Sequence, residues 1–247
     1  MKNWFDIKFN NVSEYCLQCS HFILTDYAVT PISPMNISMK NNWIRLTRNI
    51  FFIITANFLV LVMASPAQAN NASSLEPFDR WSLDFDSGAL FSIGSRASPL
   101  DYTILPQNLS LRGKALLRYE VRNGILVLRS RLSLLIQPIV QGPENYYMGL
   151  AAAPSLEWWN NSRTFSTFFS IGGGFGWMDS KGNTVLGAQG QDFNLNWFMH
   201  GGMRFQLTRQ LSATTGLYFQ HISNGGMDHI NPGIDALGPT AGIGWQF

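Results

Sequence analysis

The chain has 247 residues, of which 46% are hydrophobic and 13% are charged, and its formal net charge is +2 at pH 7. This length allows one large domain or two small ones. Basic and acidic residues are equal in number from residue 70 onward, so that part of the chain lacks the excess positive charge that nucleic-acid binding requires. We therefore expect no nucleic-acid partner.

An export signal is the first element that the sequence predicts. Three basic residues between positions 40 and 48 precede the apolar run 50–64, and small residues at 67 and 69 follow it. This order is typical of a cleaved secretory signal peptide. A transmembrane anchor is the alternative, but the run is shorter than the ~18–20 residues that span a bilayer. We expect a signal-peptide region at 35–69 and an exported domain at 70–247.

Residues 1–34 are a doubtful N-terminal extension, because a signal peptide normally lies at the start of a chain. Met35 or Met39 is the start that this pattern favours. Cys16 and Cys19 lie in the extension, and their C-x-x-C spacing has no second ligand pair. We expect no metal site there, and residues 70–247 contain no cysteine for disulfide or thiol chemistry.

Alternation of apolar and polar residues dominates the exported domain. Residues 192–207 give the clearest case, with Phe193 and Trp197 at odd positions and Asn194 and Asn196 at even ones. A period of two indicates a strand with one apolar face. The same pattern predicts eight strands, at 81–93, 109–119, 126–136, 146–159, 165–177, 192–207, 211–223 and 237–247.

The polar faces of these strands carry charges, including Arg112 and Lys114 on one strand and Arg129 and Arg131 on the next. Charged side chains are almost never buried in a soluble protein unless they are paired. They are expected if the apolar face contacts lipid and the polar face lines a closed barrel. The sequence therefore predicts an all-β fold, an eight-stranded antiparallel transmembrane β-barrel. A soluble lipocalin-like barrel is the alternative, and it would need the apolar face turned inward.

Loop lengths predict how the barrel is oriented. Short turns alternate with longer loops, the turns near 122–124, 160–163 and 208–210 and the loops near 96–108, 137–145, 178–190 and 224–236. Outer-membrane barrels have short periplasmic turns and longer external loops. We therefore expect both ends of the barrel chain in the periplasm and the seventh strand, 211–223, running outward.

Two polar residues interrupt the apolar face of the seventh strand. His221 and Ser223 are in phase with Leu217 and Phe219, so they should face lipid at the level of the outer leaflet. Positions i and i+2 of a strand lie ~7 Å apart on one face, which lets an imidazole reach a hydroxyl, as a general base reaches its nucleophile. A single polar residue at the headgroup level would carry no function, but polar groups that face lipid are a functional hypothesis by default.

A third residue should orient the imidazole, as the acid does in a Ser-His-Asp triad. Asp235 is the best candidate, because residues 231–233 turn the chain back toward the seventh strand and Asp235 has the parity of the outward Leu237. Asp228 lies in mid-loop without that constraint and is the second candidate.

The segment "HISNGG", followed by "NPGID", resembles the active-site segment of the lipid A 3-O-deacylase family, which are outer-membrane enzymes of Gram-negative bacteria. That family has an eight-stranded barrel with an outward His-x-Ser pair and an acid fourteen residues after the histidine. His221, Ser223 and Asp235 match these positions, although the family typically carries glutamate as the acid. Asn224 matches the family's proposed oxyanion donor, and the backbone N–H of Gly225 is a further donor.

This resemblance implies an esterase that removes the 3-O-linked acyl chain from lipid A in the cell outer membrane. Ser223 would attack the ester carbonyl, His221 would transfer the proton and Asp235 would hold the imidazole. No metal and no cofactor is required. The expected partners are lipopolysaccharide, membrane lipid and a second copy of the chain in a homodimer.

Two other functions stay open. An ester hydrolase of this kind could act on phospholipid, as outer-membrane phospholipases do with an outward His-x-Ser pair on a larger barrel. A non-enzymatic structural or adhesion barrel, whose loops bind partners, is the other alternative.

Overall fold

The computed structural model describes residues 76–94 and 100–247. The predicted extension at 1–34 and the predicted signal-peptide region at 35–69 lie outside the described residues, so both stay predictions. No helix in the described ranges is long and apolar enough to cross a membrane.

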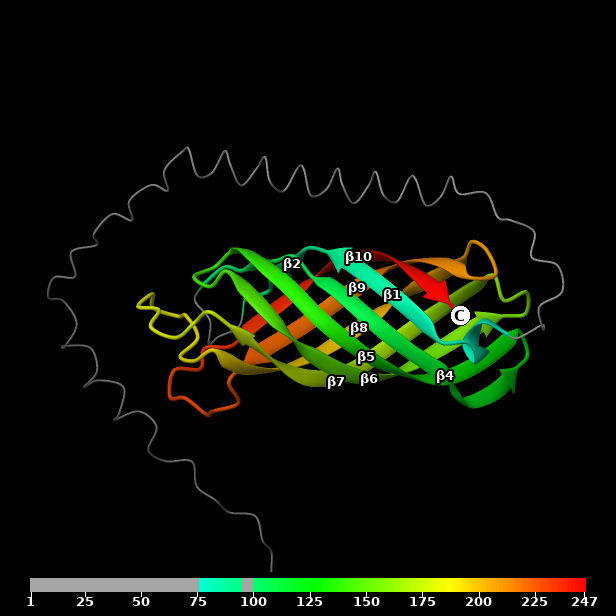
Figure 1. The fold of residues 1–247 in the computed structure, drawn as a ribbon, viewed down its shortest axis with the longest axis horizontal. Coiled ribbons are helices and arrows are strands. Elements are labelled where there is room, and N and C mark those ends of the chain that lie inside the picture. Colours follow the sequence, from blue (N-terminus) through cyan, green and yellow to red (C-terminus); the bar gives the residue numbers. More distant parts are fainter. Residues whose placement is uncertain (1–75, 95–99) are drawn as a thin grey trace, which may run out of the picture. The chain divides into compact units, whose positions relative to one another are not determined.

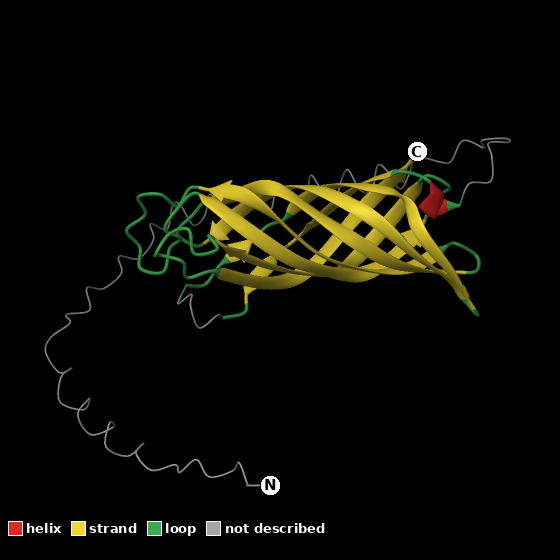
Figure 2. Cartoon of the chain, turned by 90° about the horizontal axis from the view of Figure 1, so that it is seen from below, coloured by secondary structure: helices red, strands yellow, loops and turns green. Residues whose placement is uncertain are grey.

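A single antiparallel sheet closes on itself to form the barrel (Figures 1 and 2). β10 pairs with β9 on one side and with β1 on the other, which joins the last strand to the first. In chain order the elements are the 3-10 helix η1 (Pro77–Asp79) and the strands β1 (Ser82–Gly88), β2 (Leu90–Ser92), β3 (Thr103–Ile104), β4 (Gln107–Val121), β5 (Gly124–Gln141), β6 (Tyr146–Asn160), β7 (Phe165–Met178), β8 (Phe193–Gln206), β9 (Leu211–Ser223) and β10 (Ile234–Gln246).

Ten segments make a ring of eight strands. β1 and β2 follow β10 in one unbroken register, since Gly88 lies opposite Thr240 and Phe91 lies opposite Leu237. β3 and β4 lie along β2 and β1 in the same way. The predicted eight-stranded, antiparallel all-β barrel is confirmed.

β5 and β10 extend well beyond the ends that the alternation predicts. β5 continues to Gln141 rather than ending at 136, and β10 begins at Ile234 rather than at 237. The β10 extension is held by pairing with β9, in which Ile234 lies opposite Ile222. Backbone pairing satisfies N–H and C=O groups whatever the side chains are, so hydrophobic alternation does not predict where it stops.

The two faces of the barrel follow the alternation of the sequence. Outward side chains of β8 such as Leu195 and Trp197 are exposed, whereas its inward side chains such as Asn194, Asn196 and His200 are buried. An apolar outer surface around a polar interior is the arrangement that a lipid bilayer requires of a barrel.

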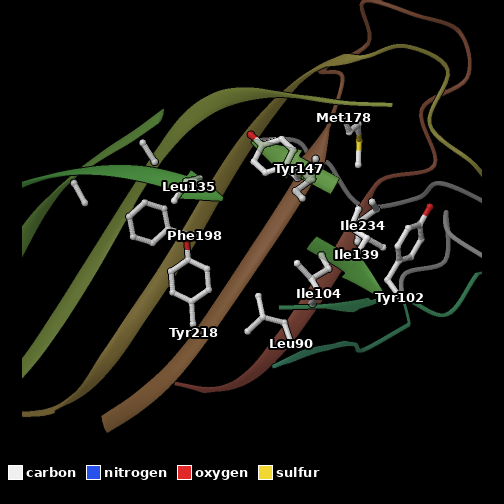
Figure 3. Close-up of a cluster of buried hydrophobic side chains, with 14 residues drawn as sticks. Leu90, Tyr102, Ile104, Leu135, Ile139, Tyr147, Met178, Phe198, Tyr218 and Ile234 are labelled. Carbon is white, nitrogen blue, oxygen red and sulfur yellow. The ribbon is translucent and has the colours of Figure 1, made fainter. Parts of the chain in front are cut away.

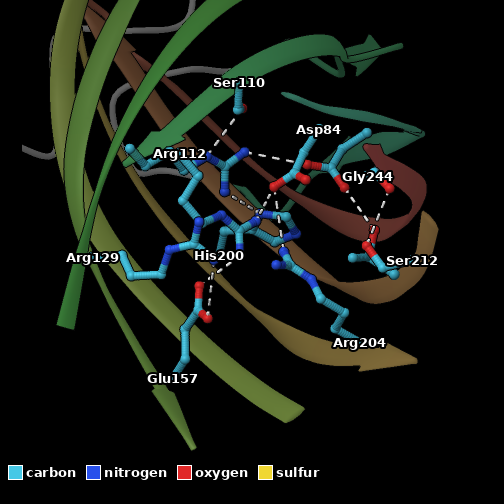
Figure 4. A network of polar contacts seen from close by, with 12 residues as sticks. Asp84, Ser110, Arg112, Arg129, Glu157, His200, Arg204, Ser212 and Gly244 are labelled. Atoms are coloured by element: carbon cyan, nitrogen blue, oxygen red, sulfur yellow. Dashed lines mark hydrogen bonds and ion pairs between the residues drawn. The ribbon is translucent and has the colours of Figure 1, made fainter. Parts of the chain in front are cut away.

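Charged side chains of the interior pair with one another (Figure 4). Arg112 binds the carboxylates of Asp84 and Glu157, with 2.7 Å between Nη1 of Arg112 and Oε1 of Glu157. Nη1 of Arg131 lies 2.8 Å from Nδ1 of His200. These contacts join side chains from β1, β4, β5, β6 and β8 across the lumen. A buried charge is tolerated when it is paired in this way.

The prediction that Lys114 shares the interior face with Arg112 is wrong. Lys114 is exposed, because the register of β4 against β5 shifts just after Arg112. At this irregularity the carbonyl oxygen of Gly113 accepts a 2.6 Å hydrogen bond from Nε of Arg129. A bulge adds one residue to a strand, so the side chains that follow it change faces.

A buried carboxylate fastens three loops together at the end of the barrel where β9 ends. Glu144 accepts hydrogen bonds from Oη of Tyr102 at 2.9 Å, from the backbone N–H of Gln189 at 2.9 Å and from Oγ of Ser180 at 3.3 Å. Burial and the negative charge of Glu144 raise the pKa of Tyr102 above its ordinary value. Tyr102 belongs to the hydrophobic cluster that fills this part of the barrel (Figure 3).

Candidate active site

Neighbouring strands bring the three predicted catalytic side chains together. His221 and Ser223 are successive outward residues at the end of β9, and Asp235 is the second residue of β10. In the antiparallel pairing of these strands, Asp235 lies directly opposite His221. Directly opposed residues of an antiparallel pair have Cβ atoms only ~5 Å apart, so the carboxylate and the imidazole meet.

Hydrogen bonds link the three side chains in series. Nδ1 of His221 lies 2.6 Å from Oδ1 of Asp235, and Nε2 of His221 lies 3.0 Å from Oγ of Ser223. A carboxylate only accepts, so Nδ1–H of His221 donates to Asp235 and Nε2 is left to accept from the Ser223 hydroxyl. This is the arrangement of a nucleophile, a general base and an orienting acid. The shorter aspartate therefore reaches the imidazole without the extra methylene of a glutamate.

The loop between β9 and β10 packs against the same imidazole. Gly233 has a φ of 73°, a left-handed conformation that favours glycine. A Cβ atom at this position would lie 3.3 Å from Cε1 of His221. Glycine thus lets the chain turn into β10 close beside the histidine.

The polar groups of Asn224 form hydrogen bonds within the loop between β9 and β10. Its side-chain Nδ2 donates to the carbonyl of Ile230 at 2.8 Å, and its backbone N–H donates to Oδ1 of Asn231 at 2.9 Å. Its Oδ1 accepts from the backbone N–H of Gly226 at 2.9 Å, and the side chain is fully buried. Of the two predicted oxyanion donors, Gly225 is the one whose N–H makes no bond to another described residue.

Apolar side chains of β8 border His221 and Ser223. Trp197 lies opposite His221 and Leu195 opposite Ser223 in the pairing of β8 with β9. The Trp197 and His221 ring centroids are 6.0 Å apart, with 32° between the ring planes. Sequence alternation placed Trp197 on the lipid-facing surface, but its proximity to His221 depends on a register that alternation does not encode.

The second candidate acid and the neighbouring histidine stay in the loop. Oδ1 of Asp228 accepts from the backbone N–H of Ile230 at 2.8 Å and lies 3.2 Å from Nδ1 of His229, which is 87% exposed. Neither residue joins His221 and Ser223. The described residues contain no cluster of three or more side chains suited to hold a metal ion.

Comparison with known families identifies the chain. The model of the family described as lipid A 3-O-deacylase (PagL) matches residues 110–244, a range that includes His221, Ser223 and Asp235. The chain belongs to the lipid A 3-O-deacylase (PagL) family. As a family member it is an outer-membrane ester hydrolase that removes the 3-O-linked acyl chain of lipid A, and the resemblance seen in the sequence is confirmed.

Other comparisons give weaker similarities. No curated protein matches the chain significantly. The outer-membrane enzyme PagL has 16% identity over 65% of this chain and 97% of its own, with a TM-score of 0.45. The attachment invasion locus protein Ail of Yersinia pestis has 12% identity over 68% of this chain and 97% of its own, with a TM-score of 0.38. OprG from Pseudomonas aeruginosa has 8% identity over 68% and 96%, with a TM-score of 0.32.

Proposed function

We propose that His221, Ser223 and Asp235 are the catalytic residues with which this family member deacylates lipid A. The observation that carries this proposal is the series of two hydrogen bonds, from Ser223 to His221 and from His221 to Asp235. The three side chains lie on the outward surface of the barrel, where a lipid ester can reach them without leaving the membrane. Polar side chains that face lipid cost free energy, so their presence on this surface indicates a functional role.

The reaction follows from the roles that these hydrogen bonds allow. Oγ of Ser223 attacks the ester carbonyl carbon while Nε2 of His221 takes the hydroxyl proton. Asp235 keeps Nδ1–H of His221 oriented and stabilises the imidazolium that forms. The bond from the acyl carbon to the sugar oxygen then breaks, and His221 returns its proton to that oxygen. Water activated by His221 hydrolyses the acyl–serine ester and frees the fatty acid.

The negative oxygen of the tetrahedral intermediate needs a hydrogen-bond donor. We assign this role to the backbone N–H of Gly225, since Asn224 donates within the loop through both its backbone N–H and its Nδ2. Gly225 has a φ of 64°, and it follows the nucleophile by two residues. Asn224 then acts by holding the loop in which Gly225 lies.

Two further parts of the proposal concern the whole chain. The barrel reaches the outer membrane after a signal peptide in residues 35–69 directs export and is cleaved. That the protein forms a homodimer stays a prediction, which the mass of the detergent-solubilised protein would test.

Mass spectrometry of lipid A tests the function. The gene is expressed in a Gram-negative host whose lipid A keeps its 3-O-linked acyl chains, and the wild type should produce lipid A lacking one such chain. Ser223→Ala should abolish this product. Thr215→Ala, which removes an outward hydroxyl from the same strand, should leave it unchanged. Lysophospholipid in place of deacylated lipid A would identify a phospholipase, and unchanged lipids in all strains would indicate a binding barrel.

A further inference from the structure

The loop between β9 and β10 is anchored to the loop at 179–192, which joins β7 to β8. The carbonyl oxygen of Ile230 accepts a 2.8 Å hydrogen bond from Nδ2 of Asn224 and a 3.1 Å hydrogen bond from the backbone N–H of Gly190. A carbonyl oxygen has two lone pairs, so both bonds form together. A single acceptor therefore connects Asn224 to the neighbouring loop.

Glycine at position 190 permits the two loops to approach this closely. A Cβ atom on Gly190 would lie 2.7 Å from the carbonyl oxygen of Ile230 and 2.5 Å from Oδ1 of Asp228. Both distances are shorter than the ~3.5 Å at which nonbonded atoms make favourable contacts. Oδ1 of Asp228 also accepts from the backbone N–H of Ile230 at 2.8 Å, so the two groups would have to move together. Any larger residue at this position would push the loops apart.

The buried carboxylate of Glu144 fixes the backbone next to Gly190. The backbone N–H of Gln189 donates to Oε1 of Glu144 at 2.9 Å, and Oγ of Ser180 donates to the same oxygen at 3.3 Å. All three of these side chains are buried. Hydrogen bonds that are shielded from water are stronger than exposed ones. Glu144 therefore holds the segment from which Gly190 reaches Ile230.

The other end of this series of contacts lies at the assigned oxyanion donor. Gly225 stands between Asn224 and Gly226, and Oδ1 of Asn224 accepts from the backbone N–H of Gly226 at 2.9 Å. The Asn224 side chain thus determines where the N–H of Gly225 lies. A donor that is misplaced by ~1 Å can lower the rate ~10²-fold, because it no longer reaches the oxygen on which charge develops.

We propose that Glu144 is a positioning residue, which holds the N–H of Gly225 where the negative oxygen of the tetrahedral intermediate forms. Glu144 acts through the Gly190 backbone and the Ile230 carbonyl. Its role is to accept hydrogen bonds, and its charge is not required. The inference rests on the proposed function, because it takes Gly225 as the oxyanion donor.

Kinetics of Glu144→Leu test the inference on the purified, folded full-length protein in detergent micelles, with a nitrophenyl ester as the substrate. Leucine has a similar size and accepts no hydrogen bond. We expect kcat to fall at least ~tenfold with KM within about twofold, since an oxyanion donor acts in the transition state rather than in substrate binding. Glu144→Gln, whose amide oxygen can still accept from Gln189, should retain most of the wild-type kcat. An unchanged kcat in Glu144→Leu would overturn the inference.

Asp179→Ala is the matched control, because Asp179 joins the same two loops as Glu144 at a more exposed place. Its carboxylate accepts from the backbone N–H and Nδ2 of Asn145 at 2.8 and 2.6 Å. We expect Asp179→Ala to keep the wild-type kcat. Equal losses of kcat in Asp179→Ala and Glu144→Leu would show that only general loosening of the loops matters, and would refute the positioning role.

Gly190→Ala tests the contact at the other loop and decides the matter if Glu144→Leu fails to fold, since Gly190 is only half-buried. It should lower kcat with an unchanged KM. The double variant of Gly190→Ala with Asn224→Ala should be no slower than Asn224→Ala alone, because both changes act on Gly225. Losses that multiply in the double variant would show independent effects and contradict the inference.

Ser223→Ala separates the inference from the proposed function. If Ser223→Ala is inactive while Glu144→Leu and Gly190→Ala keep the wild-type kcat, the positioning role is refuted and the proposed catalytic residues stand. If Ser223→Ala hydrolyses the ester at the wild-type rate, the proposed function itself fails.

Discussion

Asp235 lies directly opposite His221 in the pairing of β10 with β9, and Oδ1 of the carboxylate is 2.6 Å from Nδ1 of the imidazole. The acid and the base thus belong to two strands that are held by backbone hydrogen bonds.

Asp235→Asn keeps the size of the side chain but removes its charge. An amide can donate to Nδ1 of His221 and so favour the wrong tautomer, with no carboxylate left to stabilise the imidazolium. We expect kcat to fall by ~10⁴-fold with an unchanged barrel. Asp235→Glu, the acid typical of the family, should keep most of the activity. Equal losses in both variants would show that Asp235 acts only through packing.

Asn224→Ala should weaken both the loop and the reaction. The substitution removes the hydrogen bonds from Nδ2 to Ile230 and from Gly226 to Oδ1, at a cost of ~1–3 kcal/mol in a buried setting. Loop cleavage by a protease should therefore become faster, and kcat should fall because Gly225 is no longer fixed.

Asn231→Ala distinguishes positioning by Asn224 from direct donation to substrate. This variant leaves the Asn224 side chain in place and removes only the acceptor of its backbone N–H. A fall in kcat comparable to that of Asn224→Ala supports positioning. Full activity in Asn231→Ala, with loss in Asn224→Ala, would instead make the Asn224 amide the oxyanion donor.

Arg112→Gln should destabilise the barrel without changing its chemistry. Asp84 and Glu157 would stay buried without the guanidinium that joins them, at a cost of ~3–5 kcal/mol. Arg118→Gln is the matched control, because the Arg118 side chain is 47% exposed and its pair with Asp79 is worth at most ~1 kcal/mol. Denaturant unfolding of the two variants measures the difference. Similar losses would show that the interior network adds little.

Tyr102→Phe should change how stability depends on alkaline pH. Burial and the charge of Glu144 raise the pKa of Tyr102, so the unfolded chain loses this proton before the folded one does. The stability of the wild type should therefore fall as the pH rises above ~10, and this part of the fall should be absent in Tyr102→Phe. Thermal unfolding at several pH values between ~8 and ~11 measures it. Parallel curves for the two proteins would contradict the assignment.

Alternation along the sequence was sufficient to predict most of the barrel. It assigned Trp197 and Leu195 to the outer face and Arg129 and Arg131 to the interior, because a strand side chain's face depends only on parity. Lys114 departs from this rule because β4 is bulged just before it. A bulge depends on contacts across strands, here the bond from Arg129 to the Gly113 carbonyl.

The sequence by itself determined that His221 and Ser223 share a lipid-facing surface, since two positions on one strand need nothing beyond local geometry. Tertiary structure decided which residues lie beside them. The registers of β10 and β8 against β9 bring Asp235 and Trp197 to His221. Register is set by hydrogen bonds between strands and by the loops that join them, and a shift of one residue would turn these side chains to the other face.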